Sequence, residues 1–136
     1  MRLWHKDLIP ALPREQLIAQ WRELSAIAGA IEKKGTPNHI LVNFILDYDF
    51  DHFISYAAAV REEMTSRGYR TMNSVWDKIT SLKPSWNRLP PEQIYSEKMN
   101  DEYLQICFWN LYEKYLCKGI TEENFQKINN IIKERK

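Results

Sequence analysis

The stretch PREQLIAQWRELSAIAGAIEKKG, residues 13–35, decides the fold of this chain. Its apolar side chains recur at steps of three and four residues, at Leu17, Trp21, Leu24, Ala28 and Ile31. Residues at these steps lie on one side of an α-helix. Pro13 near the first turn and Gly35 after the last are typical start and stop signals. The pattern predicts a long amphipathic helix over residues 13–34.

The remaining sequence indicates further helices joined by mostly short connections. We expect them over residues 49–67, 73–82, 91–98, 100–118 and 121–135, with another short one beginning near residue 37 or 38. Asn73 or Ser74 is expected to cap the second of these helices and Thr121 the last. Pro84, Pro90 and Pro91 exclude regular structure from much of residues 83–91. No segment shows the sustained period-two alternation of a strand. We therefore predict an all-α fold, a single compact domain of residues 1–136 with about five or six helices and a long irregular central connection.

Composition is ordinary for a globular domain. Of the 136 residues, 44% are hydrophobic and 27% are charged, which makes disorder unlikely to dominate any part of the chain. No stretch approaches the roughly 20 apolar residues that a membrane span needs, and no signal peptide is evident, so we expect a cytoplasmic protein without a membrane partner. Cys107 and Cys117 lie about 15 Å apart along one predicted helix, too far for a disulfide. No Cys and His spacing indicates a metal site.

The net charge of +1 hides an uneven distribution. Residues 1–36 carry six basic and four acidic side chains, and residues 66–98 carry six and three. A nucleic-acid interface could draw on these two segments. The overall pI near 7.8 is nevertheless well below that of strongly basic nucleic-acid binders, and on charge alone the pattern is typical of an ordinary solvated surface.

Glu23 is the carboxylate of interest on the first long helix. At 100° per residue it lies about 120° from the centre of the apolar stripe. Its side of the helix also carries small or polar residues, namely Gln16, Ala19, Ala26 and Ala30. A carboxylate among such side chains allows another backbone to approach closely. The simpler interpretation is a surface charge among good helix formers.

The run QLIAQWREL, residues 16–24, changes this interpretation because it follows a very short N-terminal arm. With the following Gly29-Ala30 it resembles the pyrimidine-dimer DNA glycosylases with abasic-site lyase activity, a family of small phage-type endonucleases. The resemblance also takes in Lys33-Lys34, Asn38-His39-Ile40 and Arg67-Gly68-Tyr69. It covers roughly the first half of the chain and fades beyond Trp76.

The resemblance implies a specific mechanism. In that family the N-terminal α-amine attacks the sugar C1′ of the damaged nucleotide, expels the base as an imine forms, and the strand then breaks by β-elimination. An α-amine, with an ordinary pKa of about 8, offers more neutral nucleophile at physiological pH than a lysine at about 10.4. By resemblance Glu23 stabilises the developing positive charge and assists proton transfer, Arg22 holds a phosphate, and His39 lines the same pocket.

The N-terminus departs from the family pattern. The best-known members expose a threonine, followed by arginine, after removal of methionine. Here Arg2 follows Met1 directly, and methionine aminopeptidases require a small second residue, so we expect Met1 to be retained. Aligning the arginines assigns the Met1 α-amine as nucleophile and Arg2 as a phosphate or base contact. The alternative is that Arg2 is only a solvated terminal charge.

Other positions carry weaker expectations. One turn past Glu23, where the family often has a second arginine, this chain has Ser25-Ala26, which should weaken duplex binding. Gln16, with Glu15, is a candidate to probe the vacancy that a flipped-out nucleotide leaves in the duplex. The aromatic and basic C-terminal region of the family has only two loose counterparts, residues 86–88 and the cluster Trp109, Tyr112, Lys114 and Tyr115. We expect Trp109 and Tyr112 to lie in the core, His5 to order the arm and His52 to be a surface or capping residue.

The leading hypothesis is therefore a DNA-repair glycosylase and lyase. Its catalytic residues would be Met1 and Glu23, and Arg2, Gln16, Arg22 and His39 would bind damaged double-stranded DNA. We expect a monomer that uses no cofactor and no metal. Two alternatives remain open, a lyase or glycosylase for a different lesion, and a non-catalytic helical module that binds nucleic acid or protein.

Overall fold

The computed structural model describes residues 1–135, which fold into five α-helices and three short 3₁₀ helices. The α-helices are α1 (Arg14–Lys34), α2 (Phe50–Ser66), α3 (Asn73–Thr80), α4 (Asp101–Leu116) and α5 (Glu122–Glu134). The 3₁₀ helices are η1 (Lys6–Ala11), η2 (Asn43–Asp47) and η3 (Pro91–Gln93). No strand occurs in this part of the chain, and the all-α prediction is confirmed.

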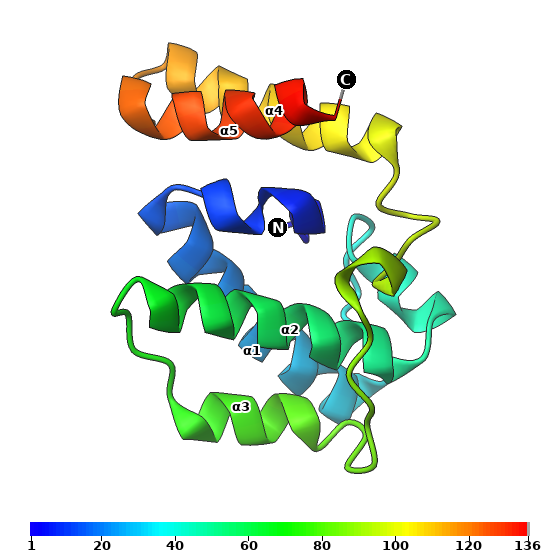
Figure 1. Cartoon of the computed structure of the whole chain (residues 1–136). Coiled ribbons are helices and arrows are strands. Elements are labelled where there is room, and N and C mark those ends of the chain that lie inside the picture. Colours follow the sequence, from blue (N-terminus) through cyan, green and yellow to red (C-terminus); the bar gives the residue numbers. More distant parts are fainter. Residues whose placement is uncertain (136) are drawn as a thin grey trace.

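The helices are stacked in levels (Figure 1). α4 and α5 pack side by side at one end of the molecule, and α3 lies at the other end against α1 and α2. The N-terminal segment runs between these levels, where η1 contacts both α2 and α5. The N-terminal arm from Leu3 to His5 is therefore buried between helices that are distant from it in sequence.

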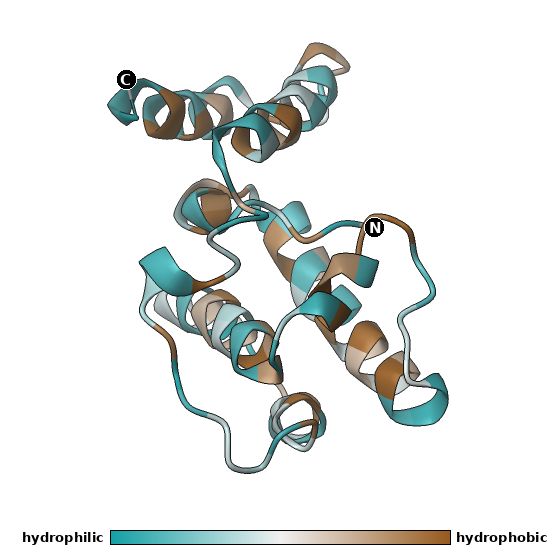
Figure 2. Cartoon of the chain, turned by 90° about the vertical axis from the view of Figure 1, so that its right-hand side faces the viewer, coloured by the Kyte–Doolittle hydropathy of each residue, from teal (hydrophilic) through white to brown (hydrophobic). Residues whose placement is uncertain are grey.

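α1 has the boundaries that its sequence predicts. Pro13 occupies the N-cap position, and Gly35 ends the helix in the left-handed conformation at φ 74°. A residue with a side chain is strained at that angle, which explains a glycine there. The predicted apolar stripe is buried along its whole length, and the side chains of Leu17, Leu24 and Ala28 are completely inaccessible. Figure 2 shows the corresponding alternation of hydrophobic and hydrophilic residues around the helices.

The central connection from α3 to α4 is irregular, as predicted, and polar contacts tie it to α2. The carboxylate of Asp51 accepts a hydrogen bond from the Asn87 backbone N–H at 2.9 Å. The Ser55 hydroxyl accepts one from the Leu89 N–H, also at 2.9 Å. Because a loop cannot satisfy its backbone groups by itself, these side chains replace the hydrogen bonds that a helix or strand would provide.

His52 takes part in the same arrangement, and the prediction of a surface or capping role for it is wrong. It is half-buried, stacks on the Tyr95 ring, and its Nδ1 accepts a hydrogen bond from the Tyr95 N–H at 3.0 Å. Tyr95 has a positive φ of 48°, which no α-helix accommodates. The helix predicted over residues 91–98 is therefore reduced to η3.

Two other predicted elements differ from the structure. No helix starts at residue 37 or 38, because Asn38 has a left-handed φ of 52° and a tight turn follows it, leading into η2. α3 begins at Asn73 but ends at Thr80, and neither Asn73 nor Ser74 caps it, because Met72 occupies its N-cap position without a side-chain hydrogen bond. The cap predicted for the last helix is confirmed, since the Thr121 hydroxyl accepts a hydrogen bond from the Asn124 N–H.

Candidate active site at the N-terminal arm

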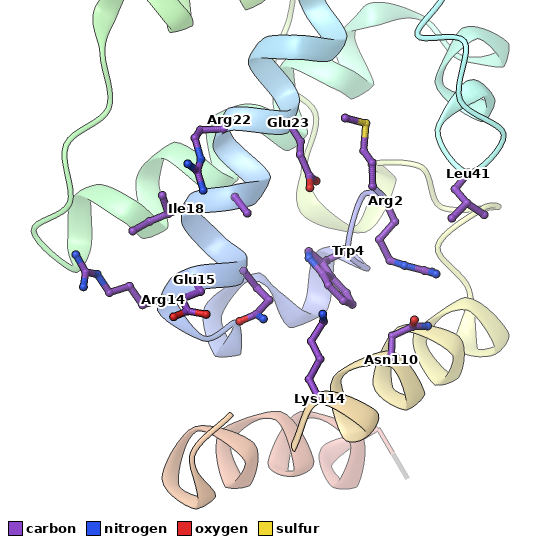
Figure 3. Close-up of a pocket in the computed structure, with 13 residues that line it drawn as sticks. Arg2, Trp4, Arg14, Glu15, Ile18, Arg22, Glu23, Leu41, Asn110 and Lys114 are labelled. Atoms are coloured by element: carbon purple, nitrogen blue, oxygen red, sulfur yellow. The ribbon is translucent and has the colours of Figure 1, made fainter. Parts of the chain in front are cut away.

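A cleft of about 690 Å³ opens where the N-terminal arm, α1 and α4 meet. The arm contributes Met1, Arg2 and Trp4, and α1 contributes a row of residues that includes Gln16, Arg22 and Glu23. Asn110 and Lys114 reach it from α4, and Leu41 from the turn before η2. Figure 3 shows Glu23 pointing from α1 into the space beside Arg2 and Trp4. Segments far apart in the sequence thus share one cavity.

The buried carboxamide of Gln20 holds the arm against α1. Its Oε1 accepts a hydrogen bond from the Trp4 N–H at 2.8 Å, and its Nε2 donates to the Arg2 carbonyl at 3.0 Å. The second hydrogen of Nε2 is directed at Glu23 Oε2, 3.2 Å away. One side chain therefore fixes the backbone on both sides of Leu3 and also contacts the candidate catalytic carboxylate.

Two tyrosines also hold the arm, and together with Gln20 they form what we call the clamp. The Tyr56 hydroxyl of α2 lies 2.6 Å from the Trp4 carbonyl and 2.8 Å from Gln20 Oε1, and it can donate its single hydrogen to either. The Tyr103 hydroxyl of α4 donates to the Leu3 carbonyl. Burial raises the pKa of both phenols, so they remain neutral donors. The arm is thus held from three helices.

His5 ends the arm, and its predicted ordering role is confirmed. It is completely buried, its Nδ1 accepts the Asp7 N–H at 3.1 Å, and its Nε2 lies 2.8 Å from the Met99 carbonyl. This pairing requires the neutral tautomer with the proton on Nε2. Burial lowers the pKa of His5, which favours the same neutral form.

Glu23 lies in an environment with opposing electrostatic effects. Partial burial raises the pKa of its carboxyl group above the ordinary value, and this effect is the largest. The positive charges of the N-terminal amine, Arg22 and His39 act in the opposite direction but do not cancel it. Met1 and Glu23 both line the cleft, so the chain terminus and the carboxylate border the same space.

Cationic side chains outnumber acidic ones around the cleft. Arg2, Arg14, Arg22 and Lys114 face two carboxylates, Glu15 and Glu23. Figure 3 shows Arg14 and Arg22 along α1, and Lys114 rising from α4 on another side. The Arg2 guanidinium lies 5.9 Å from the centre of the Trp4 ring, within cation–π range. An excess of positive charge of this kind favours the approach of a polyanion.

Five of the six residues predicted from the sequence lie on this cleft, namely Met1, Arg2, Gln16, Arg22 and Glu23. His39 does not line it. The His39 ring instead accepts a hydrogen bond from the Leu41 N–H at 3.2 Å. The expectation that His39 lines the pocket is therefore corrected to a position just behind its rim.

The prediction that Trp109 lies in the core is wrong, since 57% of its surface is exposed. α4 turns Phe108, Tyr112 and Tyr115 towards Phe125 of α5, and this contact leaves Trp109 on the outside of the helix pair. Tyr112 is half-buried in that aromatic cluster. Helical spacing alone does not show which of several aromatic faces a neighbouring helix covers.

Sequence reasoning missed Gln20, Asn110 and Lys114. Gln20 lies next to Trp21 at the edge of the apolar stripe, and a glutamine there resembles an ordinary surface residue. Gln20 is buried because the backbone of the N-terminal arm needs hydrogen-bond partners. No periodicity in the sequence reveals this need. Lys114 was a loose candidate only, and no local signal places it or Asn110 beside residues more than 90 positions away in the chain.

A sequence model of the family described as pyrimidine dimer DNA glycosylase matches residues 1–77, more than half of the chain. The chain belongs to this family. Membership implies glycosylase activity on pyrimidine dimers and DNA as substrate. No curated protein and no solved structure shows significant similarity to the chain.

In this member of the pyrimidine dimer DNA glycosylase family, the segment that matches the family supplies most of the residues that line the cleft. The match spans the arm, α1, α2 and the first half of α3, and it ends one residue after Trp76, where the resemblance was expected to fade. All cleft residues fall within it except Asn110 and Lys114. Among the described residues, no helix is long and apolar enough to cross a membrane.

The Gln20 clamp predicts a stability effect that its sequence position does not suggest. Gln20→Ala leaves the buried Trp4 N–H without its partner and removes the hydrogen bond to the Arg2 carbonyl, and we expect a loss of about 3 kcal/mol in the free energy of unfolding. Urea denaturation measures this. Gln126→Ala, which removes a bond to the exposed Glu122 on α5, should cost less than about 0.5 kcal/mol. Equal stability of the two variants would contradict the clamp.

Glu23 should make stability depend on pH in a defined direction. A carboxyl group whose pKa is raised on folding stabilises the protein below its ordinary value of 4.5, and this contribution is lost as pH rises through the folded-state pKa. Glu23→Gln removes the penalty of burying a charge and keeps an acceptor for Gln20. The variant should therefore be more stable than the wild type at pH 7, and the difference should shrink below pH 4.5.

Thermal or urea unfolding at both pH values tests this expectation. Glu32→Gln, on the exposed face of the same helix, is the matched control and should show no such change. A Glu23→Gln variant that is less stable than the wild type at pH 7 would show that the charge of Glu23 is net stabilising.

Proposed function

We propose that this protein is a DNA glycosylase and abasic-site lyase that acts on damaged double-stranded DNA through an imine formed by the α-amine of Met1. The observation that carries the proposal is the Gln20 carboxamide, which bonds to the arm backbone and to Glu23 at the same time. This arrangement holds the backbone of Arg2 and Trp4 against the helix that bears Glu23, and the chain terminus and the carboxylate line the same cation-lined cleft.

The proposed chemistry needs only groups that the cleft supplies. The neutral α-amine forms a bond to C1′ of the damaged nucleotide, and the base leaves with the electrons of the glycosidic bond and takes up a proton. The sugar ring then opens as the C1′–N bond becomes an imine, and the ring oxygen becomes a hydroxyl group. Loss of a C2′ proton expels the 3′ phosphate by β-elimination, and water finally releases the amine.

Glu23 is suited to the proton transfers in this sequence. A group transfers protons well when its pKa approaches the working pH, and burial moves the pKa of Glu23 in that direction. In its ionised state the same carboxylate stabilises the cationic imine. Protonated, it can supply the hydrogen that the ring oxygen needs on opening.

Arg2 and Arg22 are proposed phosphate contacts on either side of the reacting sugar, and Gln16 a contact to the extrahelical base. Gln16 supports this role because its Oε1 is buried in the cleft wall without a hydrogen-bond partner among the described residues. His39 would act by holding the turn that carries Leu41 into the cleft rather than by touching the substrate. Lys114 adds a phosphate contact from α4 that partly compensates for the absence of an arginine after Glu23.

Borohydride trapping tests the nucleophile directly. The wild type is incubated with a duplex that contains an abasic site or a thymine dimer, and borohydride reduces any imine to a stable amine. We expect a covalent adduct that mass spectrometry locates at the Met1 α-amine. An N-terminal tag should abolish the adduct, whereas a C-terminal tag should leave it. An adduct on a lysine, or none during turnover, would refute the Met1 assignment.

Glu23→Gln tests the carboxylate separately. The amide preserves size and the contact to Gln20, so binding to an abasic-site duplex should stay within about threefold, while strand cleavage falls by about 100-fold or more. Gel-shift binding and single-turnover cleavage provide the two readouts, with Glu32→Gln as control. Full cleavage by Glu23→Gln would remove Glu23 from the mechanism.

A further inference from the structure

The two basic segments of the sequence meet where α3 packs against α1. Residues 1–36 and 66–98 carry the excess of positive charge, α1 belongs to the first segment and α3 to the second, and the two helices are in contact. The cations of the second segment that carboxylates neutralise are Arg67, Lys83 and Arg88. Lys78 of α3 forms no ion pair with any of residues 1–135. Its positive charge is therefore not neutralised by the described part of the protein.

The Lys78 side chain lies against α1 at Gly29. Lys78 is half-buried, and a Cβ atom added at Gly29 would lie only 3.4 Å from its Nζ atom. Because Gly29 has no side chain, the ammonium group from α3 can lie directly on this helix. Lys78 therefore adds a positive charge to the surface of α1 at a position where α1 itself supplies no side chain.

Lys78 continues a row of cations that begins in the cleft. Arg22 is exposed on α1 and lines the cleft (Figure 3). At 100° and 1.5 Å per residue, Gly29 lies about 20° around the helix from Arg22 and about 10 Å further along it. Lys33 is also exposed and follows about one turn after Gly29 on the same side. Arg22, Lys78 and Lys33 thus form a row of about 16 Å that leads out of the cleft along α1.

The charge of this row identifies the kind of ligand that fits it. None of its three cations forms an ion pair within residues 1–135, so the repulsion between them is not relieved by a carboxylate. A strand of duplex DNA carries one phosphate per about 3.4 Å of helix axis, so the row extends over about five nucleotides. A lysine ammonium is a compact charge that attracts a phosphate without reading a base. The row therefore fits the backbone of one DNA strand.

We infer that Lys78, together with Lys33, holds phosphates of the DNA backbone outside the cleft, about three to five nucleotides from the damaged site. This inference rests on the proposed function, because it takes as ligand a duplex whose damaged site lies at the cleft. It extends the DNA interface from the arm, α1 and α4 to α3, which lies at the opposite end of the molecule from α5 (Figure 1). Since phosphate contacts carry no sequence information, Lys78 strengthens binding to damaged and intact duplexes equally.

The salt dependence of binding counts this contact without any chemistry. Binding to a duplex of about 20 base pairs with a central uncleavable tetrahydrofuran site is measured between about 50 and 200 mM salt. Lys78→Gln should reduce the slope of log K against log salt by about 0.9 and weaken binding about fivefold near 0.1 M salt. Lys78→Arg keeps the charge and should stay within about twofold of the wild type. Lys127→Gln, which removes an exposed lysine of α5, is the matched control and should leave the slope unchanged.

Neutral phosphates locate the contact on the DNA. In a series of the same duplexes, a methylphosphonate replaces one phosphate at a time. The wild type should lose about fivefold in affinity at one or two positions about three to five nucleotides from the tetrahydrofuran site, and Lys78→Gln should lose less than about twofold there. A contact next to the tetrahydrofuran site, or no position at which the two proteins differ, would overturn the inference.

An intact duplex separates this inference from the proposed chemistry. Lys78→Gln should weaken binding to it by the same factor as binding to the tetrahydrofuran duplex, and a loss confined to the damaged duplex would overturn the inference. Wild type that binds both duplexes with a slope unchanged by Lys78→Gln would overturn the inference alone. A Lys78-dependent slope in a protein that forms no imine adduct would support the contact and refute the proposed reaction. Wild type that binds neither duplex would refute both.

Discussion

The buried carboxamide at position 20 must satisfy four groups at once, and the geometry of the cleft follows from how it does so. It accepts from the Trp4 N–H and is within reach of the Tyr56 hydroxyl, and it donates to the Arg2 carbonyl and to Glu23. A short terminal arm would normally fray, because few contacts hold it. Here the arm is buried from Leu3 to His5, and its polar backbone must be paired inside the protein. The course of the arm is consequently fixed by the core.

Glu23 illustrates the cost of such an arrangement. Folding withdraws its carboxylate partly from water, which raises its pKa, and the nearby amine and guanidinium recover only part of that energy. Structural needs alone would favour a neutral side chain at this position. A partly desolvated carboxylate instead has strengthened electrostatic interactions and a pKa nearer to neutrality, both of which serve proton transfer at a cationic intermediate. Stability and the proposed chemistry therefore make opposite demands on this residue.

Features that depend on local periodicity were predictable, and features that depend on distant backbone were not. The length of α1, its buried stripe and its end at Gly35 follow from spacing and one glycine. The role of Gln20 does not, because its partners are backbone groups 16 and 18 positions away. The prediction that Trp109 lies in the core failed for a related reason. Helical spacing shows that α4 has several aromatic faces but not which one α5 covers. Five of the six predicted site residues line the cleft. They could be predicted only because the resemblance to a family supplied the tertiary information that residue spacing lacks.

The residues that are proposed to carry out the reaction and those that are proposed to hold the DNA lie in different parts of the cleft. Gln20 and the arm residues Leu3 to His5 are locked into the core and belong to the family-matched segment, whereas Lys114 and Asn110 reach the rim from α4 beyond it. Substituting a locked residue disturbs both the fold and the reaction, since the same hydrogen bonds serve both. Substituting a rim residue changes only contacts with solvent or substrate. Under the proposed function, contacts with the DNA can therefore change at Asn110 and Lys114 while Tyr103 of the same helix keeps its hydrogen bond to the arm.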